Sequence, residues 1–222
     1  MDDAGFAARR EAMVTAQIAG RGIRDPAVLA ALRAVPREAF VAAPLNECAY
    51  DDTPLPIEEG QTISQPYIVA LMLEAAALGP GDRVLEVGAG SGYACAVASR
   101  IAGRVDAVER HPALAASARE RLARLGYANV AIHCADGSGG WPARAPFNAI
   151  LVAAGGPRVP ATLREQLALG GRLVMPVGAT RGEQRLIRLT RRGERDYRED
   201  DLGGVLFVPL IGAHGWAAEP DG

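Results

Sequence analysis

The residues best suited to chemistry in this sequence begin with a glycine-rich turn in the segment VLEVGAGSGY. Gly88, Gly90 and Gly92 follow an apolar run that predicts a strand, and a helical pattern comes after them. Glycine lets the backbone take positive φ angles and lets a ligand approach it closely, so the turn is a candidate cofactor site. Tyr93 stands where the dinucleotide fingerprint has its third glycine, so the turn alone identifies no cofactor.

Acidic residues lie at the expected carboxyl ends of consecutive strands. Glu86 precedes the glycine turn, Glu109 ends the next predicted strand, and Asp136 follows the one after it, in front of Gly137. Glu109 could accept hydrogen bonds from ribose hydroxyls, and Asp136 could accept one from an adenine amino group. Each also has a structural alternative, because Asp136 could make a turn and Glu109 could cap the helix that begins near Pro112. Together they predict an adenosine-shaped crevice where the strand order reverses.

An alternation of strand and helix patterns from residue 82 onward would position these groups. The predicted strands cover residues 83–88, 104–109, 129–134, 148–154 and 171–177. The predicted helices between them cover about 91–102, 111–125 and 160–168. Apolar strands that alternate with helices predict an α/β fold with a doubly wound, mostly parallel sheet that is covered on both faces.

The C-terminal part follows a different pattern. Residues 183–193 and 203–212 predict an antiparallel strand pair at the edge of the sheet. The charge run TRRGERDYREDD between them predicts a solvated loop.

The beginning of the chain reads as a helical extension. Helical patterns run from about 6 to 19 and from Pro26, where Asp25 is the expected N-cap. A turn-rich loop, 50–60, leads into the polar hook GQTISQ, and a third helix begins at about Pro66. The predicted parts are the helical extension with its hook (1–80), an α/β core (81–212) and a C-terminal tail (213–222).

Composition and charge exclude several classes of function. All 24 basic residues are arginine, so no lysine can form a Schiff base, and the net charge of −2 suggests neither a nucleic-acid nor a membrane surface. The three cysteines lack metal-ligand spacing and the three histidines are scattered, so we expect no metal site. We expect the cysteines to be small buried thiols, as in a reducing compartment. The sequence has no apolar signal segment and no apolar run of about 20 residues, so we predict a cytoplasmic protein. The sequence does not set the oligomeric state, and a monomer is favoured.

The acids and the glycine turn resemble the S-adenosylmethionine-dependent methyltransferases over about residues 82–210, which implies a Rossmann-like sheet that binds S-adenosyl-L-methionine. The segments VPREAFV, DDTPLPI, GQTISQPYIVA and FVPLIG resemble the protein-L-isoaspartate (D-aspartate) O-methyltransferase family, from about residue 10 to 212. This resemblance implies methyl transfer to the free α-carboxylate of L-isoaspartyl residues in damaged proteins or peptides. The ester would then close to a succinimide, and S-adenosyl-L-homocysteine would be the other product.

The same resemblance implies roles for the polar hook and for a late segment. Ser64 would contact the cofactor and orient the substrate carboxylate, or it could cap the third helix. Val208 and Leu210 would lie along a peptide substrate that binds through main-chain hydrogen bonds. No strong general base is needed, because the substrate carboxylate is ionised at neutral pH. Cofactor contacts are then expected at Thr62, Ile63, Ser64, Glu86, Gly88, Gly90, Gly92, Glu109, Asp136 and Gly137.

Alternatives stay open on the sequence alone. An enzyme with the same chemistry could methylate a normal aspartate in a dedicated peptide, and a non-catalytic nucleotide-binding module could share the glycine turn. Tyr93 and the lack of a proton donor disfavour a nicotinamide oxidoreductase. His133 is expected to be a core or edge residue, and Trp141 could close over the adenine or pack beneath its loop.

Overall fold

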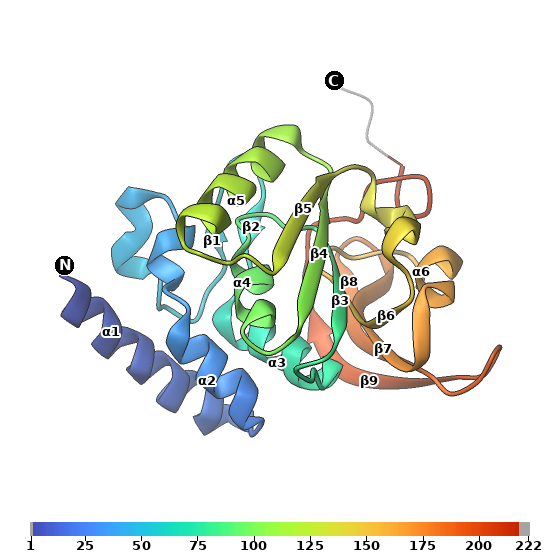
Figure 1. Cartoon of the computed structure of the whole chain (residues 1–222), viewed down its shortest axis with the longest axis horizontal. Helices are drawn as coiled ribbons and strands as arrows, with labels where there is room; N and C mark the ends of the chain where they lie inside the picture. Colours follow the sequence, from blue (N-terminus) through green and yellow to red (C-terminus); the bar gives the residue numbers. More distant parts are fainter. Residues whose placement is uncertain (1, 218–222) are drawn as a thin grey trace.

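A seven-stranded sheet lies at the centre of the protein, of which the computed structural model describes residues 2–217 (Figure 1). The strand order is β5-β4-β3-β6-β7-β8-β9. These strands are β3 (Arg83–Val87), β4 (Arg104–Glu109), β5 (Val130–Cys134), β6 (Phe147–Val152), β7 (Leu167–Thr180), β8 (Glu183–Arg191) and β9 (Tyr197–Val205). Neighbouring strands from β5 to β7 are parallel, and β8 and β9 are antiparallel to their neighbours. The predicted mostly parallel sheet with an antiparallel C-terminal pair is confirmed.

Helices precede the sheet and connect its parallel strands. The α-helices of the described residues are α1 (Asp3–Ala12), α2 (Pro26–Ala34), α3 (Pro66–Ala76), α4 (Tyr93–Ser99), α5 (Pro112–Arg124) and α6 (Ala161–Glu165). A π-helical stretch, Met13–Ile18, continues α1. Short 3₁₀-helices lie at Ala19–Arg21, Arg37–Phe40, Ala43–Cys48, Gly137–Gly139 and Pro142–Arg144.

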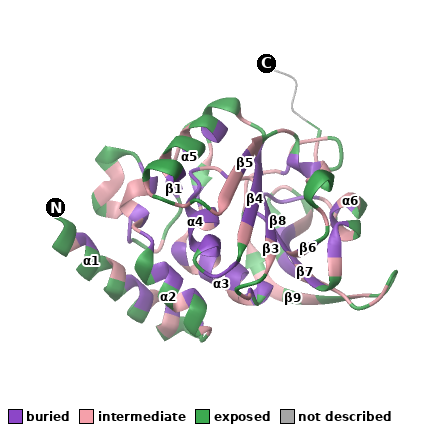
Figure 2. Ribbon diagram, in the orientation of Figure 1, coloured by how far each residue is buried: buried purple, intermediate pink, exposed green. Residues whose placement is uncertain are grey.

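Successive side chains of the central strands enter two separate cores, because side chains alternate between the faces of a sheet. Val84 and Ala107 belong to a core shared with α3, α4 and α5. Leu85 and Val108 belong to a second core, which includes Leu163 of α6. Figure 2 shows the central strands buried by this packing. Both faces of the sheet are therefore covered, as predicted.

The N-terminal extension packs onto the first of these cores. Met13 and Leu32 are buried in the same cluster as the strand residues. Helix α2 begins as predicted, since the Asp25 carboxylate accepts hydrogen bonds from the amides of Ala27 at 2.8 Å and Val28 at 3.3 Å. In Figure 1, α1 and α2 lie on the side of the molecule opposite α6.

A short hairpin leads from the extension into α3. Its strands, β1 (Leu55–Pro56) and β2 (Thr62–Ile63), are antiparallel. At the tip Glu59 and Gly60 both have positive φ angles, 58° and 63°, as in a type I′ turn. Positive φ is uncommon for a residue with a β-carbon, so Glu59 is held in a strained conformation.

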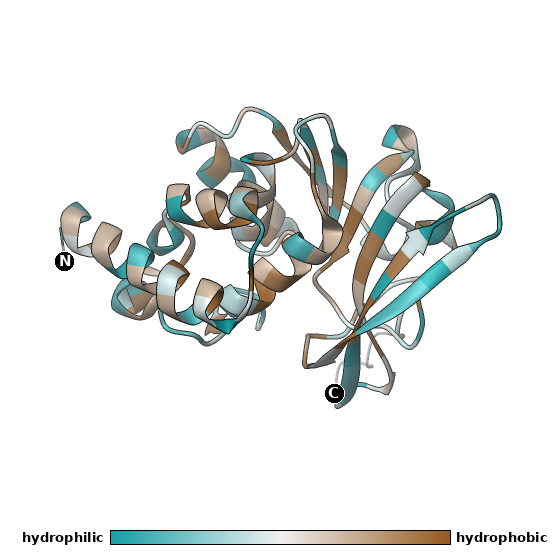
Figure 3. Cartoon of the chain, turned by 90° about the horizontal axis from the view of Figure 1, so that it is seen from below, coloured by the Kyte–Doolittle hydropathy of each residue, from teal (hydrophilic) through white to brown (hydrophobic). Residues whose placement is uncertain are grey.

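The charged segment near the C-terminus is largely strand. β8 and β9 cover residues 190–191 and 197–201 of the charge run, so the predicted loop is confined to residues 192–196. The second strand of the predicted pair is β9 rather than 203–212, of which only 203–205 are strand. Ion pairs across the two strands stabilise this arrangement: Arg188 contacts Asp200 at 2.9 Å, and Arg185 contacts Asp201 at 2.8 Å. The charges that suggested a loop lie on an edge strand, and Figure 3 shows this part of the sheet as mainly hydrophilic.

The cysteines differ in exposure. Cys95 is buried and Cys48 is half-buried, but Cys134 is exposed at the end of β5. The expectation of buried thiols is therefore wrong for Cys134, because β5 is an edge strand with a neighbour on one side alone. Within residues 2–217 no helix is both long enough and apolar enough to cross a membrane.

Candidate active site

A pocket opens at the carboxyl ends of β3, β4 and β6, where the strand order reverses. β3 has β4 on one side and β6 on the other, and open α/β sheets bind ligands at such a point. The pocket holds about 930 Å³ of space, including its open mouth, which is enough for a cofactor-sized ligand. The predicted site residues that line it are Thr62, Ile63, Ser64, Glu86, Gly88, Gly90, Glu109, Gly137, Val208 and Leu210.

The glycine turn forms one wall of this pocket. Gly88 and Gly90 have φ angles of 90° and 52°, which residues with a β-carbon rarely adopt. A β-carbon at Gly90 would lie 3.4 Å from Cδ1 of Ile57, so the hairpin packs directly on the turn. The turn and the hairpin therefore meet at the pocket.

Glu109 is fixed at the end of β4 by backbone amides. It is 4% exposed, and its two carboxylate oxygens accept hydrogen bonds from the amides of Gly90 and His111, both at 2.9 Å. Each oxygen has a further lone pair, so Glu109 can still accept hydrogen bonds from a ligand. The N-cap of α5 is His111, without a side-chain cap hydrogen bond. The alternative role of Glu109 as the cap of this helix is therefore wrong.

Glu86 is a buried acid at the end of β3. It is 2% exposed, and this burial raises its pKa to about 7; a hydrogen bond with the Cys95 thiol acts in the opposite direction, and the charge of Glu109 raises it further. Its Oε2 atom has no hydrogen-bond partner among the described residues. A buried acceptor without a partner in a pocket wall is where a ligand donor would bind.

Gly92 and Asp136, two of the predicted site residues, are not part of this lining. Gly92 precedes α4 with a φ of 86°, and a β-carbon there would lie 3.2 Å from Leu122 of α5. The Asp136 carboxylate accepts hydrogen bonds from the amides of Ser138 and Ala213, both at 2.8 Å. Partial burial alone would raise the pKa of Asp136, but these hydrogen bonds lower it. Gly92 thus permits helix packing, and Asp136 holds a turn and the C-terminal segment.

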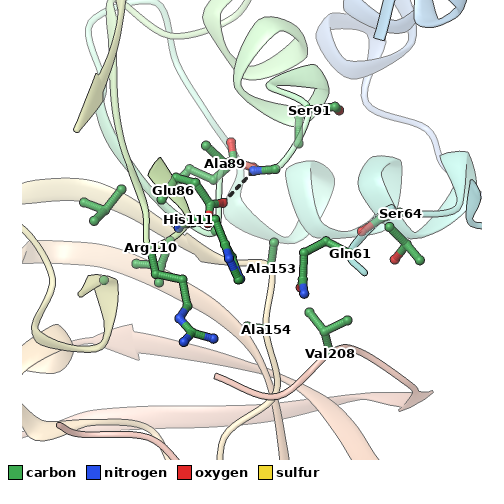
Figure 4. A pocket seen from close by; sticks show the side chains of 18 of the residues that line it. Gln61, Ser64, Glu86, Ala89, Ser91, Arg110, His111, Ala153, Ala154 and Val208 are labelled. Carbon is green, nitrogen blue, oxygen red and sulfur yellow. Dashed lines mark hydrogen bonds between the residues drawn. The ribbon is translucent and has the colours of Figure 1, made fainter. Parts of the chain in front are cut away.

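The polar hook reaches the pocket from the end of β2. Ser64 is half-buried, and its hydroxyl forms no hydrogen bond within the described part of the chain. The N-cap of α3 is Gln65, which makes no side-chain cap hydrogen bond, so the alternative in which Ser64 caps this helix is wrong. Gln65 instead donates to the carbonyl of Asp52 at 3.1 Å, which anchors the hook. Figure 4 shows Ser64 across the cavity from Glu86.

The segment after β9 runs along the same pocket. Gly155 donates to the carbonyl of Val208, and Leu210 donates back to the carbonyl of Gly155, both at 2.8 Å. The buried side chain of Gln184 pairs with both backbone groups of Phe207, at 2.9 and 3.0 Å. These hydrogen bonds fix the position of the segment, and Val208 and Leu210 line the pocket.

Several residues that line the pocket are not among the site residues predicted from the sequence. The main ones are Gln61, Arg110, His111, Ala153 and Ala154. His111 was not predicted because the scattered histidines suggest no metal site. Its position just after an acid that ends a strand is the sequence signal that could have indicated it. The alanines follow β6 directly, so the topology of the sheet brings them to the site.

Trp141 lies outside the lining of the pocket. Its ring stacks on His133, with 4.3 Å between the ring centroids. The Nε2 atom of His133 lies 2.9 Å from Oδ1 of Asp106. Trp141 thus packs beneath its loop instead of closing over the pocket. His133 is a residue of the sheet edge, which was one of its two expected positions.

The lining fits an adenosine cofactor with an amino acid part. Nε2 of His111, like Oε2 of Glu86, is buried and has no partner among the described residues. Hydroxyl and amino groups of a ligand would satisfy these atoms and Glu109, while apolar residues such as Ile63 and Val108 would contact its flat and aliphatic parts. Among the described residues, no group of three or more His, Cys, Asp or Glu could hold a metal ion.

Comparisons with known proteins agree with this geometry. A family profile described as Protein-L-isoaspartate(D-aspartate) O-methyltransferase (PCMT) matches residues 8–215. Protein-L-isoaspartate O-methyltransferase 1 of Rhodopseudomonas palustris (strain HaA2) is 61% identical over 218 residues, which cover 98% of this chain and 89% of the relative. Protein-L-isoaspartate O-methyltransferase 2 of Pelobacter propionicus (strain DSM 2379 / NBRC 103807 / OttBd1) is 61% identical over 208 residues, 94% of this chain and 92% of the relative.

Solved structures show the same likeness. A protein-L-isoaspartate O-methyltransferase structure matches with a TM-score of 0.84 and 31% identity, over 93% of this chain and 67% of that one. A Plasmodium falciparum structure described as a protein-L-isoaspartate O-methyltransferase beta-aspartate methyltransferase (PCMT), in complex with S-adenosyl-L-homocysteine, matches with a TM-score of 0.79 and 27% identity. That match covers 91% of this chain and 98% of the other.

Proposed function

This chain belongs to the protein-L-isoaspartate (D-aspartate) O-methyltransferase family, and from that membership we propose how its pocket carries out the reaction. The enzyme transfers a methyl group from S-adenosyl-L-methionine to isoaspartyl residues of damaged proteins. The methyl ester formed on the α-carboxylate leads to a succinimide, from which repair proceeds. When bound, S-adenosyl-L-methionine supplies an activated methyl group on a sulfonium.

We assign the cofactor to the wall formed by the ends of β3 and β4. Gly88 and Gly90 leave room for close approach to the backbone, and Glu109 would accept hydrogen bonds from ribose hydroxyls. The unpartnered Oε2 of Glu86 would accept a hydrogen bond from the amino group of the cofactor. Thr62, Ile63 and Gly137 complete the lining.

The chain must supply alignment rather than strong acid–base chemistry. The α-carboxylate of the substrate is already ionised near neutral pH, so no general base has to activate it. Ser64 donates a hydrogen bond to this carboxylate and orients it, while the walls of the pocket limit the access of water. The observation that carries this proposal is the unpartnered Ser64 hydroxyl, which lines the same cavity as Glu86 and Glu109.

The extended segment that contains Val208 and Leu210 holds the peptide. Its hydrogen bonds with Gly155 and Gln184 fix the segment, and a substrate strand could pair with the backbone groups that these contacts leave free. Recognition through the main chain tolerates many sequences, which supports general repair over a dedicated peptide substrate. Gly92 and Asp136 act in this proposal through packing and loop structure.

Further parts of the proposal concern the whole chain. The extension (1–80) delivers the hook, the core (81–212) binds the cofactor, and the tail (213–222), of which 218–222 lie outside the described residues, begins with a segment tied to Asp136. We propose a monomeric enzyme that acts on proteins or peptides and binds no nucleic acid. Three free thiols support a reducing compartment such as the cytoplasm.

Replacement of Ser64 tests the assigned mechanism. A hydrogen bond to a charged group contributes about 1.5–3 kcal/mol, so Ser64→Ala should lower kcat roughly 10- to 100-fold. The affinity for S-adenosyl-L-homocysteine, measured by titration calorimetry, should stay within about twofold. Ser99→Ala is the matched control, since its hydroxyl bonds to the carbonyl of Ala96 inside α4 and lies outside the pocket lining. Undiminished turnover of the Ser64 variant would remove this residue from the mechanism.

A further inference from the structure

His111 joins the tip of the hairpin to the cofactor pocket. Its ring lines the pocket, and Nε2 is buried there with no hydrogen-bond partner among the described residues. On the other side of the ring, Nδ1 lies 3.5 Å from Oε2 of Glu59. Figure 4 shows the ring projecting into the cavity beside Ala153. The two ring nitrogens therefore have different surroundings, one the hairpin and one the ligand space.

The contact with Glu59 determines what Nε2 can offer. In the neutral imidazole, a carboxylate near Nδ1 favours the tautomer with the proton on that nitrogen, which leaves the lone pair on Nε2. Because Nε2 has no partner among the described residues and the residue lines the pocket, it can accept a hydrogen bond from a ligand. The backbone amide of His111 donates to Glu109 at 2.9 Å, so this residue is bonded to the acid assigned to the ribose.

The hairpin tip carries Glu59 to this contact. Glu59 keeps a φ of 58° in spite of its β-carbon, and such strain persists where the surrounding structure enforces it. Its neighbour Ile57 packs against the glycine turn, as the 3.4 Å approach to a β-carbon at Gly90 shows. The same hairpin ends in the hook that carries Ser64.

We propose that His111 is a cofactor-binding residue whose Nε2 accepts a hydrogen bond from a ribose hydroxyl, and that Glu59 is a positioning residue that holds its ring. The inference rests on the proposed function, because it takes S-adenosyl-L-methionine as the ligand. It adds a link between the cofactor and the hairpin. Through that link, cofactor binding stabilises the hairpin that presents Ser64.

Calorimetric titration of S-adenosyl-L-homocysteine tests the assignment in the wild-type protein and in His111→Phe, His111→Gln, Glu59→Gln and the double variant His111→Phe/Glu59→Gln. Loss of one hydrogen bond predicts roughly fivefold weaker binding for His111→Phe, with partial recovery in His111→Gln, whose amide can still accept. Glu59→Gln alone should weaken binding about twofold. It should weaken binding no further when His111 is already replaced by Phe, because Glu59 acts through the histidine ring.

A nucleoside ligand and a distant histidine complete the experiment. 5′-Methylthioadenosine has the ribose but no amino acid part, so His111→Phe should weaken its binding by the same factor. His214→Phe is the matched control, since His214 is exposed and outside the pocket lining, and it should bind both ligands as the wild type does. Thermal unfolding without ligand should show that all variants are folded.

Defined outcomes would overturn the inference. Wild-type affinity in His111→Phe would show that His111 does not contact the cofactor. Equal losses of affinity in His111→Phe and His111→Gln would show that it accepts no hydrogen bond from it. A loss confined to S-adenosyl-L-homocysteine would exclude the ribose as partner. An undiminished Glu59→Gln effect in the double variant would exclude the positioning role. Failure of the wild-type protein to bind either ligand would instead contradict the proposed function itself.

Discussion

At the scale of single residues, the pocket contains acceptors that the protein leaves unsatisfied. Glu86 is the clearest case, because it is buried, its pKa is raised to about 7 by that burial, and one of its oxygens has no partner among the described residues. A buried acid with one oxygen unpartnered costs stability in the free protein. A cofactor that carries an amino group would offset this cost. Glu86 therefore favours cofactor binding but lowers the stability of the free protein.

Glu86→Gln should separate these two effects. The folded protein keeps the Glu86 proton up to about pH 7, whereas an acid with the ordinary pKa of 4.5 loses it earlier in the unfolded chain. Stability contributed by this residue therefore falls as pH rises from about 4.5 to 7, by about 3 kcal/mol in total. Without cofactor, the variant should melt at a higher temperature than the wild type at pH 8 and show no such advantage at pH 4.5. Differential scanning calorimetry across this pH range measures it, and a difference independent of pH would contradict the account.

The same residues show what sequence can predict about a site. Glu86 and Glu109 are predictable because the strand pattern places their side chains at the carboxyl edge of the sheet. Asp136 has a similar position in the sequence, but its carboxylate is taken by the amides of Ser138 and Ala213, and the second lies far along the chain. His111 escapes prediction because its role depends on a hairpin that packs on it from about 50 residues away.

At the scale of elements, the glycine turn serves packing as well as binding. Gly88 and Gly90 face the pocket, whereas Gly92 lies where α4 begins and meets Leu122 of α5. A sequence pattern of three alternating glycines assigns all three to the ligand. The structure assigns the third to the contact between two helices.

Gly92→Ala tests this division of roles. A residue with a β-carbon at φ 86° is strained by about 1–2 kcal/mol, and the 3.2 Å contact with Leu122 adds to it. Gly126→Ala is the control, since Gly126 has a φ of 80° but nothing within 4 Å of its added carbon. Gly92→Ala should lower the melting temperature more than the control, while both variants bind S-adenosyl-L-homocysteine as the wild type does. Lost affinity in Gly92→Ala at an unchanged melting temperature would restore Gly92 to the cofactor site.

Elements were predictable where their signal was local. Asp25 and Pro26 mark the start of α2 in the sequence, and the structure has that cap. The edge strand β9 was not predictable from its charges, because what stabilises it is pairing with β8 through residues such as Arg188 and Asp200. Charge alone does not distinguish a solvated loop from the exposed face of an edge strand.

At the scale of the whole molecule, two separate parts of the chain meet at one point of the sheet. The strand order reverses at β3, which opens the pocket between the ends of β3, β4 and β6. The extension brings Ser64 to that opening from one side, and the segment with Val208 and Leu210 lies along it. The alternation of strands and helices predicts this sheet. The position of the hook at the pocket depends on tertiary packing. The family resemblance indicated this position, whereas the periodicity of the sequence did not.

The most direct test of this account uses two peptides of one sequence that differ at a single residue, L-isoaspartate in one and L-aspartate in the other. Each is incubated with the protein and methyl-labelled S-adenosyl-L-methionine, and the methanol released by base is counted. We predict base-labile methyl transfer to the isoaspartyl peptide and transfer at background level to the aspartyl peptide. Equal transfer to both peptides, or transfer to neither, would contradict the assignment of this pocket to isoaspartyl repair.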